Sequence, residues 1–452
     1  MINNLKLKLK VKKYNLSQQL KYFLHARLNK PLAFMLYIVG CFIKFILRLN
    51  YGFSLILKSR RIANINMVTN TIDKIISKNA GMNALEDLLP KTDNKTIFGL
   101  INRVLILKLP NLQSDTVVEK GVIIVKFTET FTVLYKDINV SELLKYFYLV
   151  LEPSWVGYSL PEILIWNKFS DKSVIILSPR RDDFELVSRL GTSIVPVSTG
   201  SADWVNPEKF YKKQSEEKAY DVIYLANFNP IKRVERFVRA IKNISSVVGG
   251  YKAVLVLASH GVAKNELEKI IEDARNSTGL SVFSNLSQDE INTLFNKSKV
   301  NILISLREGQ NKGLAEGMFA GTPSILLKEC ASGNYLHINE STGKIVEDKD
   351  LEEELMWFAD NYQKYKPDVW ANKNISPQVS TSRLQESIKE IEGQMGRQWS
   401  KDMFVKVNQP ELSYLDNESD YLLSMRSEIL NLFLKGSDIS GIQRSLQNIT
   451  SY

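Results

Sequence analysis

The chain has 452 residues, of which 44% are hydrophobic and 24% charged, a globular composition that excludes a disordered or low-complexity protein. This length exceeds what one hydrophobic core supports, so we expect two domains with additional segments. The net charge of +10 is confined to the N-terminus, since residues 1–61 contain thirteen Lys and Arg and no Asp or Glu. A basic arm on an otherwise slightly acidic chain argues against nucleic acid and favours an anionic membrane surface as partner.

Residues 1–70 are expected to form this basic, membrane-associating arm. The alternation of Leu and Lys from Leu5 to Lys10 favours a strand or an extended segment lying on lipid. The apolar run 32–43 is shorter than the roughly 18 to 20 residues of a spanning helix, so we predict helices that lie in the membrane interface. A spanning helix and a cationic helix packed on the protein's own core are the alternatives. One face of the helix before this run carries Leu16, Leu20, Phe23, Leu24 and Leu28.

Apolar runs separated by helical stretches predict two α/β domains, at residues 71–205 and 206–399, followed by a helical tail at 400–452. In the first domain we expect strands at 104–107, 122–125, 148–151, 174–177 and 193–197. In the second we expect strands at 221–225, 253–257 and 300–305 and helices at 234–244, 264–275 and 289–297. Such alternation implies parallel sheets whose strand ends face a cleft.

The basic and apolar signals of residues 1–61 lie outside these two domains. We therefore expect a chain without residues 1–61 to leave the membrane and to keep nucleotide binding.

The most informative stretch is SLREGQNKGLAEGMFAGTP, residues 305–323. It joins a buried strand to a helix through a loop with glycines, and such a junction directs backbone N–H groups and the positive end of a helix at an anion such as phosphate. Glu308 ends the strand and Glu316 lies in the first turns of the helix, so both carboxylates can accept hydrogen bonds from sugar hydroxyls. The spacing alone is equally compatible with an alternative in which neither carboxylate binds a ligand. In that case Glu316 only complements the helix dipole and Glu308 is a solvated loop charge.

This stretch resembles the retaining glycosyltransferases of glycosyltransferase family 4. Glu308 and Glu316 have the E-x7-E spacing of that family, and residues 317–323 resemble its E-A-M-A-x-G-x-P helix. The segments at 286–290 and 299–304 also look like the family's helix and strand before the motif. The resemblance covers residues 193–348 and implies the GT-B fold, in which two Rossmann-like domains face a cleft.

The resemblance also assigns roles to individual residues. Glu308 would contact the donor sugar and Glu316 the ribose hydroxyls, while Lys232 would hold the diphosphate, so that Glu308 and Lys232 are the predicted catalytic residues. The other residues that we expect to bind the donor are Asn227, Arg233, His260, Arg307, Gly309, Gln310, Asn311, Lys312, Gly313, Leu314 and Gly333.

Two positions depart from the family. Asn227 stands where an arginine normally pairs with the lysine, so Arg233, Arg307 or Lys312 would supply the second positive charge. The family's acceptor-side histidine has no counterpart, because no His lies between residues 25 and 260. Residues 348–350 have the D-x-D spacing of metal-dependent transferases, but they precede a helix and do not follow a buried strand, so we expect no metal site.

The sequence therefore predicts a metal-independent, retaining glycosyltransferase without a bound cofactor. It would move a sugar from a UDP- or GDP-linked donor to a lipid-linked or surface-polysaccharide acceptor. We expect it in the cytoplasm, attached peripherally to the inner face of the cell membrane, and its two distant cysteines suit a reducing compartment. The alternative is a GT-B protein that binds a nucleotide-sugar or glycan without turnover, as a partner in an assembly.

Overall fold

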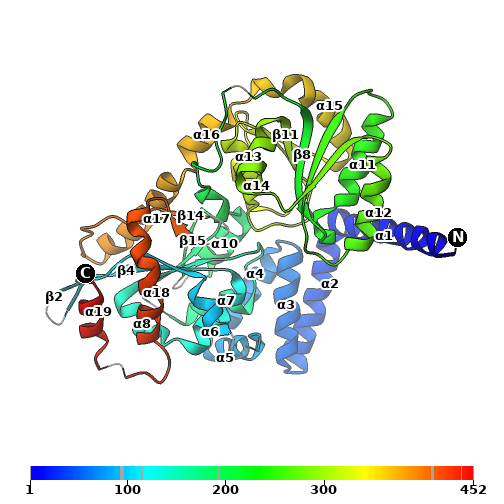
Figure 1. The fold of residues 1–452 in the computed structure, drawn as a ribbon. Helices are drawn as coiled ribbons and strands as arrows, with labels where there is room; N and C mark the ends of the chain where they lie inside the picture. The colour runs from blue at the N-terminus through cyan, green and yellow to red at the C-terminus, as the bar shows by residue number, and fades with distance from the viewer. Residues whose placement is uncertain are drawn as a thin grey trace. The chain divides into compact units, whose positions relative to one another are not determined.

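The chain divides into two compact units. A computed structural model describes residues 2–91, 96–113, 116–169, 171–190, 194–214, 216–408, 412–438 and 440–450. Unit 1 comprises Met1–Leu28 and Val205–Ser376, and unit 2 comprises Asn29–Trp204 and Pro377–Tyr452 (Figure 1). Each unit contains a sheet with helices packed against it, which confirms the predicted α/β class. The chain passes between the units three times, at positions that differ from the predicted ends of the arm and of the tail.

Unit 1 is built on a six-stranded parallel sheet with the order β10-β9-β8-β11-β12-β13. The order reverses between β8 and β11, and doubly wound sheets bind ligands outside the carboxyl ends of the strands at such a point. The strands are β8 (Tyr220–Asn227), β9 (Lys252–Ala258), β10 (Gly279–Ser284), β11 (Ser298–Leu303), β12 (Ser324–Leu327) and β13 (Gly343–Val346).

The helices of unit 1 include the three that the periodicity predicted, α11, α12 and α13. A capping box between Ser287 and Glu290 sets the start of α13. Strands β10, β12 and β13 were not predicted, because β10 and β13 mix buried with exposed positions and β12 has only four residues. The helices are α11 (Val234–Ser245), α12 (Lys264–Arg275), α13 (Gln288–Asn296), α14 (Lys312–Phe319), α15 (Leu351–Asn361) and α16 (Pro367–Asn374).

Unit 2 has a five-stranded sheet in the order β1-β4-β5-β6-β7. All five strands lie where the apolar runs predicted them, but β1 runs antiparallel to β4, so the expectation of an all-parallel sheet is wrong here. Between β1 and β4 the described residues form the short strands β2 (Asn111–Gln113) and β3 (Thr116–Glu119), whereas a parallel pair needs a longer crossover, usually helical. The strands are β1 (Val104–Lys108), β4 (Gly121–Lys126), β5 (Phe147–Glu152), β6 (Val174–Leu177) and β7 (Ile194–Val197).

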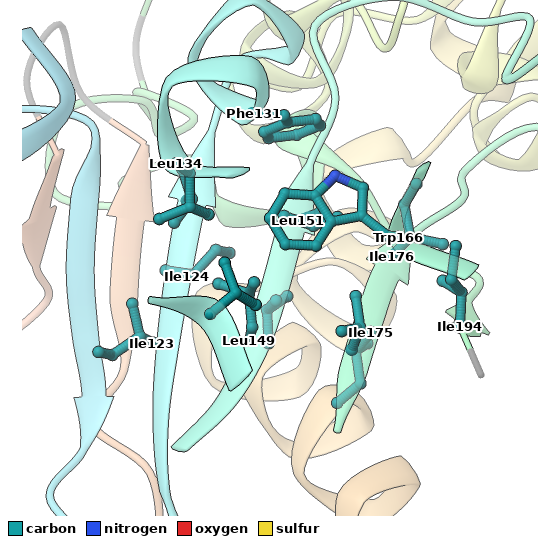
Figure 2. Close-up of a cluster of buried hydrophobic side chains, with 14 of the residues drawn as sticks. Ile123, Ile124, Phe131, Leu134, Leu149, Leu151, Trp166, Ile175, Ile176 and Ile194 are labelled. Atoms are coloured by element: carbon teal, nitrogen blue, oxygen red, sulfur yellow. The ribbon is translucent and has the colours of Figure 1, made fainter. Parts of the chain in front are cut away.

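Fully buried strands form the core of unit 2. Every residue of β4 and β5 is buried, as expected for strands covered on both faces. Phe131 and Leu134 of α7 (Thr128–Asp137) pack with Trp166 and the strand side chains in one cluster (Figure 2). The other helices that follow the sheet strands are α8 (Val140–Tyr146), α9 (Pro161–Leu164) and α10 (Arg181–Arg189).

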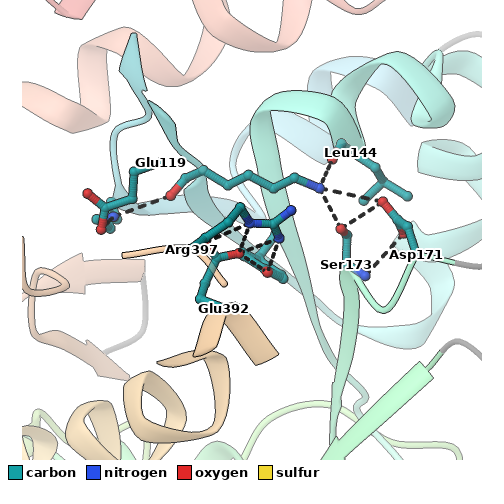
Figure 3. Close-up of polar contacts among 9 residues, drawn as sticks. Glu119, Leu144, Asp171, Ser173, Glu392 and Arg397 are labelled. Carbon is teal, nitrogen blue, oxygen red and sulfur yellow. Dashed lines mark hydrogen bonds and ion pairs between the residues drawn. The ribbon is translucent and has the colours of Figure 1, made fainter. Parts of the chain in front are cut away.

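The C-terminal segment packs into unit 2 and is not a separate appendage. Side chains from all three of its helices belong to the core cluster, among them Leu384, Leu430 and Leu446. Arg397 donates to Glu392 at 2.5 Å and to the Tyr148 hydroxyl at 3.1 Å, beside Glu119 (Figure 3). The elements are α17 (Pro377–Gln394), the antiparallel pair β14 (Lys406–Asn408) and β15 (Leu412–Tyr414), α18 (Tyr421–Leu432) and α19 (Ile442–Thr450).

The predicted arm is helical and divided between the units. Helix α1 (Ile2–Arg27) belongs to unit 1 and includes Leu5–Lys10, so the extended segment expected there is wrong. Leu and Lys are both good helix formers, and alternation specifies a strand only where a sheet takes up the apolar side. The remaining N-terminal helices, all in unit 2, are α2 (Asn29–Cys41), the π-helix η1 (Phe42–Ile46), α3 (Asn50–Ile62), α4 (Asn66–Ile76), α5 (Asn79–Leu88) and α6 (Thr96–Ile101).

Two findings revise expectations about these helices. Among the described residues, one helical run, Asn29–Ile46, is long and apolar enough to cross a membrane by length and composition, and 17% of it is buried. Phe53, Ile56 and Leu57 of α3 belong to the core of unit 2. Removing residues 1–61 would therefore remove core side chains of unit 2, so the premise that this segment is separate from the folded domains is wrong.

Candidate functional site

Two charged side chains meet at the point where the strand order of unit 1 reverses. Lys232 follows β8 and Glu308 follows β11, and the two strands are neighbours. The Lys232 Nζ donates to Glu308 Oε1 at 2.5 Å, and the side chains are 16% and 10% exposed. The structure thus brings together the two residues predicted to be catalytic, as an ion pair that keeps some contact with solvent.

A short turn positions Lys232. Residues Pro230–Lys232 form one 3-10 turn, whose first free N–H, that of Ile231, donates to the Asn229 side chain at 3.2 Å. The carbonyl of Ile231 accepts from the Leu306 N–H at 2.9 Å, which ties the turn to the chain that follows β11. The hydroxyl of Tyr224 donates to the Lys232 carbonyl, and burial raises the pKa of Tyr224 well above its ordinary value, so this donor keeps its proton.

Glu308 is held by its own backbone. Its N–H donates to the Ala331 carbonyl at 2.9 Å, and the Ala331 N–H donates to the Leu306 carbonyl at 3.0 Å. These two bonds extend the β11–β12 pairing beyond the strands, because they follow the parallel bridge between Arg307 and Ala331. These backbone hydrogen bonds therefore fix the position of the Glu308 Cα at the edge of the sheet, from which the carboxylate extends.

The loop after Glu308 is joined to the loop after β12. The Gly333 N–H donates to the Gly309 carbonyl at 2.7 Å, so Gly333 lies against the predicted donor loop. Asn334 forms two bonds with Asn311: its side chain accepts from the Asn311 N–H at 2.6 Å and donates to the Asn311 carbonyl at 3.1 Å. The two loops therefore form one rigid rim around the start of α14.

Glu316 lies one turn into α14. The N-cap residue Asn311 accepts from the Leu314 N–H at 3.0 Å, which leaves Lys312 as the first helical residue and Glu316 four positions later. Burial raises the pKa of Glu316, and the nearby Lys312 ammonium lowers it. Among the residues that the structure describes, none donates a hydrogen bond to this carboxylate. Glu316 is therefore a half-buried side chain whose oxygen atoms accept no hydrogen bond from the described residues.

Asn227 and His260 meet at the ends of β8 and β9. The Asn227 Nδ2 lies 2.8 Å from His260 Nε2, and its Oδ1 accepts from the Asn229 N–H at 3.0 Å. Gly261 has a φ of +136°, and a Cβ there would lie 2.3 Å from the Phe228 carbonyl carbon, so glycine is required. The predicted pocket neighbour His260 thus lies close to the site, and Asn227 already has two protein partners.

Two predicted donor-binding residues are directed elsewhere. Arg233 is 5% exposed, and its Nη2 donates to Asp348 Oδ1 at 3.1 Å. It has a left-handed backbone with φ of +54°, which no sequence pattern indicated. Gln310 is buried, and its Nε2 lies 3.1 Å from Nε2 of His337. The structure therefore pairs these side chains with the surrounding protein and not with Lys232 or Glu308.

Several supporting residues were missed by the sequence analysis. Asn301 Nδ2 donates to the Gly313 carbonyl at 2.9 Å, and an Asn inside an apolar strand was a signal that could have revealed it. Asp348, from the D-x-D pattern, also accepts from Arg236 at 3.0 Å, so two arginines neutralise it. In the part of the chain that the structure describes, no group of three or more His, Cys, Asp or Glu residues could hold a metal ion.

Comparisons with known proteins place the site within one matched region. Residues 205–370 match the family described as glycosyl transferases group 1, and this range includes Lys232, Glu308 and Glu316. The resemblance noted in the sequence is thereby confirmed. No protein of curated function matches the chain.

Solved structures are similar at low sequence identity. TarM is 14% identical over 60% of this chain with a TM-score of 0.46, and the alignment spans about half of TarM, 54% of its length. Sucrose-phosphate synthase from Thermosynechococcus elongatus is 14% identical over 60% of this chain and 74% of its own, with a TM-score of 0.47. Anabaena HepE in complex with UDP is 11% identical over 59% of this chain and 79% of its own, with a TM-score of 0.46.

Proposed function

We propose, from the match of residues 205–370 to the group 1 glycosyl transferases, that the protein transfers a sugar from a nucleotide-sugar to a glycan or lipid-linked acceptor. One observation carries the proposal: the matched region places the Lys232–Glu308 pair at the point where the strand order of its sheet reverses. Ligands of doubly wound sheets bind at this point. The pair is partly exposed, so a ligand can reach both charges.

The chemistry follows from the charges around this point. The Lys232 ammonium and the N-terminus of α14 would stabilise the negative charge that develops on the leaving diphosphate. Glu316 would accept hydrogen bonds from the ribose hydroxyls, and Glu308 would orient the donor sugar while holding Lys232. The leaving phosphate would take the acceptor proton, with retention at the anomeric carbon. The side chains thus position the reactants and need neither a metal ion nor a bound cofactor.

Binding and turnover test the proposal separately. We expect UDP or GDP to raise the unfolding temperature of the full chain, since a ligand at a hundred times its Kd adds about 2.7 kcal/mol of stability. A sugar donor built on the nucleotide that binds should be hydrolysed, or its sugar should be transferred, with retention at the anomeric carbon. NMR of the product detects this stereochemistry. A protein that binds neither nucleotide and turns over neither donor class contradicts the proposal. Binding without hydrolysis or transfer would instead support the alternative of a non-catalytic partner protein.

We also propose that the N-terminal helices attach the protein to the anionic inner face of the membrane. Helix α2 packs on α3, where Gly40 lies against Ile56 and the Ala33 carbonyl accepts from Ser59. Tyr37, also buried, bonds to Thr71 of α4. Its other face and η1 carry exposed apolar side chains, with Lys44 and Arg48 close by, which suits an interface of apolar chains below anionic headgroups. The exposed side chains are Phe34, Met35, Ile38, Val39, Phe42, Phe45 and Ile46.

Vesicle binding tests this attachment. The wild-type chain should sediment with vesicles that contain anionic lipid and less with neutral ones, because both charge and apolar area contribute. Replacing Phe42 and Phe45 with Ser should lower sedimentation and leave UDP or GDP binding unchanged. Equal sedimentation of the wild type and the double variant would contradict it. A lipid-linked acceptor would be presented at this same membrane surface, so we expect the protein to prefer acceptors that carry a lipid chain. Transfer rates to a panel of acceptors with and without a lipid chain test this preference.

A further inference from the structure

Helix α1 has two faces with different surroundings. Gln18, on the inner face, is 7% exposed, and α1 lies against α12 in unit 1. Tyr14 lies four positions before Gln18 and Tyr22 four positions after it, so these three side chains share this face. The outer face carries Leu16, Leu20 and Phe23, which are 67%, 58% and 52% exposed. The helix therefore docks on the protein through polar and aromatic side chains and presents its apolar face outward.

The inner face reaches the neighbour of a predicted catalytic residue. The ring of Tyr22 lies 4.2 Å from the Arg233 guanidinium, as a cation–π contact. Arg233 is 5% exposed, and it also donates to Asp348 at 3.1 Å and to the Ile304 carbonyl, at the end of β11, at 3.4 Å. One buried guanidinium thus connects α1, the sheet and the segment before α15.

Arg233 shares its turn with Lys232. Its backbone is left-handed, with φ of +54° and ψ of +41°, a conformation that a non-glycine residue keeps only where its surroundings enforce it. The Arg233 N–H donates to the Pro230 carbonyl at 3.1 Å, which closes the turn. Contacts of the Arg233 side chain therefore add to the hydrogen bonds that hold this turn, and the backbone of the turn sets where the Lys232 side chain begins.

We propose that Tyr22 is a positioning residue for the donor site: by holding Arg233 it fixes the turn that carries Lys232, so the affinity for a nucleoside diphosphate depends on the docked α1 helix. The inference rests on the proposed donor site at Lys232. Truncating the arm would then weaken donor binding even where unit 2 stays folded. Tyr22 would act through Arg233 and needs no contact with the donor.

Three variants of the full chain isolate this contact. Tyr22→Leu keeps an apolar side chain but removes the aromatic face, whereas Tyr22→Phe keeps the face and removes only the hydroxyl. Phe23→Ala is the matched control, because Phe23 is the next residue and lies on the outer face, 52% exposed. The readouts are Kd for UDP and GDP by calorimetry and the separate kcat and KM for the nucleotide-sugar that the wild type uses.

We expect Tyr22→Leu to raise the Kd for the bound nucleotide by about three- to tenfold, the range that cation–π energies convert to. Tyr22→Phe should restore binding to within about twofold of the wild type, and Phe23→Ala should leave it unchanged. KM should rise more than kcat falls, because the missing contact positions the donor before the reaction.

Two outcomes would overturn the inference while leaving the donor site in place. The first is a folded Tyr22→Leu protein that binds UDP or GDP as tightly as the wild type. The second is equal weakening by Tyr22→Leu and Phe23→Ala, which would indicate a general loss of the helix. A double-mutant cycle with Arg233→Lys adds a test that does not depend on Tyr22→Leu alone, since additive effects would show that the residues act independently. If the wild type binds neither nucleotide, the proposed function itself fails.

Discussion

Both units have lysine and glutamate side chains at or just after the carboxyl ends of parallel strands. The two sets of side chains differ in how far they are buried. In unit 2, Lys406 Nζ lies 2.5 Å from Glu152 Oε2 and Lys126 Nζ 3.5 Å from Glu152 Oε1, with side-chain exposures of 0%, 2% and 8% for Lys406, Glu152 and Lys126. In unit 1, Lys232 and Glu308 are 16% and 10% exposed. The same charge chemistry is sealed in one sheet and accessible in the other.

The C-terminal segment accounts for the difference. Strand β14 supplies Lys406 and also Asn408, whose Oδ1 accepts from Lys126 Nζ at 3.0 Å. The ring of Trp204 lies 3.9 Å from Lys406 Nζ and covers it further. In unit 1 the pair lies between the segments that follow β8 and β11, and among the described residues no other segment adds a charged partner to it. The charges at the strand ends of unit 2 are therefore withdrawn from solvent, whereas Lys232 and Glu308 in unit 1 keep some contact with it.

The largest expected effect is on the stability of unit 2. Lys406→Met removes the nearer partner of Glu152 and leaves the buried carboxylate with only Lys126, whose Nζ lies 3.5 Å away. We therefore expect a loss of about 3 kcal/mol in the free energy of unfolding, at the lower end of what breaking a buried ion pair costs. Urea denaturation followed by tryptophan fluorescence measures it. Lys401→Met, at an exposed position, is the control. A Lys406→Met protein as stable as the control would show that the sealed cluster contributes nothing to the fold.

Acid should weaken unit 2 through the same cluster. Burial raises the pKa of Glu152, but Lys406 and Lys126 outweigh it and lower the pKa from 4.5 to about 2. A depressed folded-state pKa gives stability that is present above pH 4.5 and is lost as pH falls toward 2. The loss should be roughly 3 kcal/mol over this window. Urea midpoints measured across it should shift less in Lys406→Met, and an identical shift would assign the pH dependence to other carboxylates.

The accessible pair should respond in activity and not in stability. Glu308→Gln removes the charge that orients Lys232 and the donor sugar, so we expect turnover to fall by about a hundredfold or more, roughly 2.7 kcal/mol. The unfolding midpoint should shift less than in Lys406→Met, because Lys232 is 16% exposed and water can replace part of the lost partner, whereas Lys406 is fully buried. Glu268→Gln, with a side chain 52% exposed on α12, is the control. Unchanged kcat and KM in Glu308→Gln would mean that the site is misplaced.

Much of this arrangement was predictable where one local signal decided it. Continuous apolar runs located the five sheet strands of unit 2, and the E-x7-E spacing identified Glu308 and Glu316. The antiparallel direction of β1 was not predicted, because it depends on the absence of a helix in the connection to β4.

Long-range partners could not be predicted. Lys126 and Glu152 stand at the ends of predicted strands, but Lys406 lies 254 residues after Glu152, and no local pattern connects them. The direction of the Arg233 side chain likewise depends on a left-handed backbone and on contacts with Tyr22 and Asp348. Proximity of this kind results from tertiary packing, which overrides what a short window of sequence specifies.

The smallest effect that we predict concerns the second positive charge of the accessible site. Asn227 stands where the family has an arginine, and its side chain already bonds to His260 and to the Asn229 N–H, so it adds no charge. The Arg233 guanidinium already forms an ion pair with Asp348. Lys312, the first residue of α14, remains close enough to lower the pKa of Glu316, and its point charge can neutralise phosphate without bidentate geometry.

Lys312→Ala should therefore lower kcat/KM by about tenfold, a transition-state loss of roughly 1.4 kcal/mol. Lys264→Ala is a matched control, because Lys264 is also the first residue of a helix, α12, and its side chain is 51% exposed. Adding Asn227→Arg to Lys312→Ala should recover only part of the loss, since the new arginine also breaks the bonds of Asn227 to His260 and Asn229. Equal losses in both lysine variants would indicate a general effect of net charge. An unchanged Lys312→Ala would show that Lys312 is not the second positive charge and would leave Arg307 and the helix N–H groups to assist Lys232 at the diphosphate.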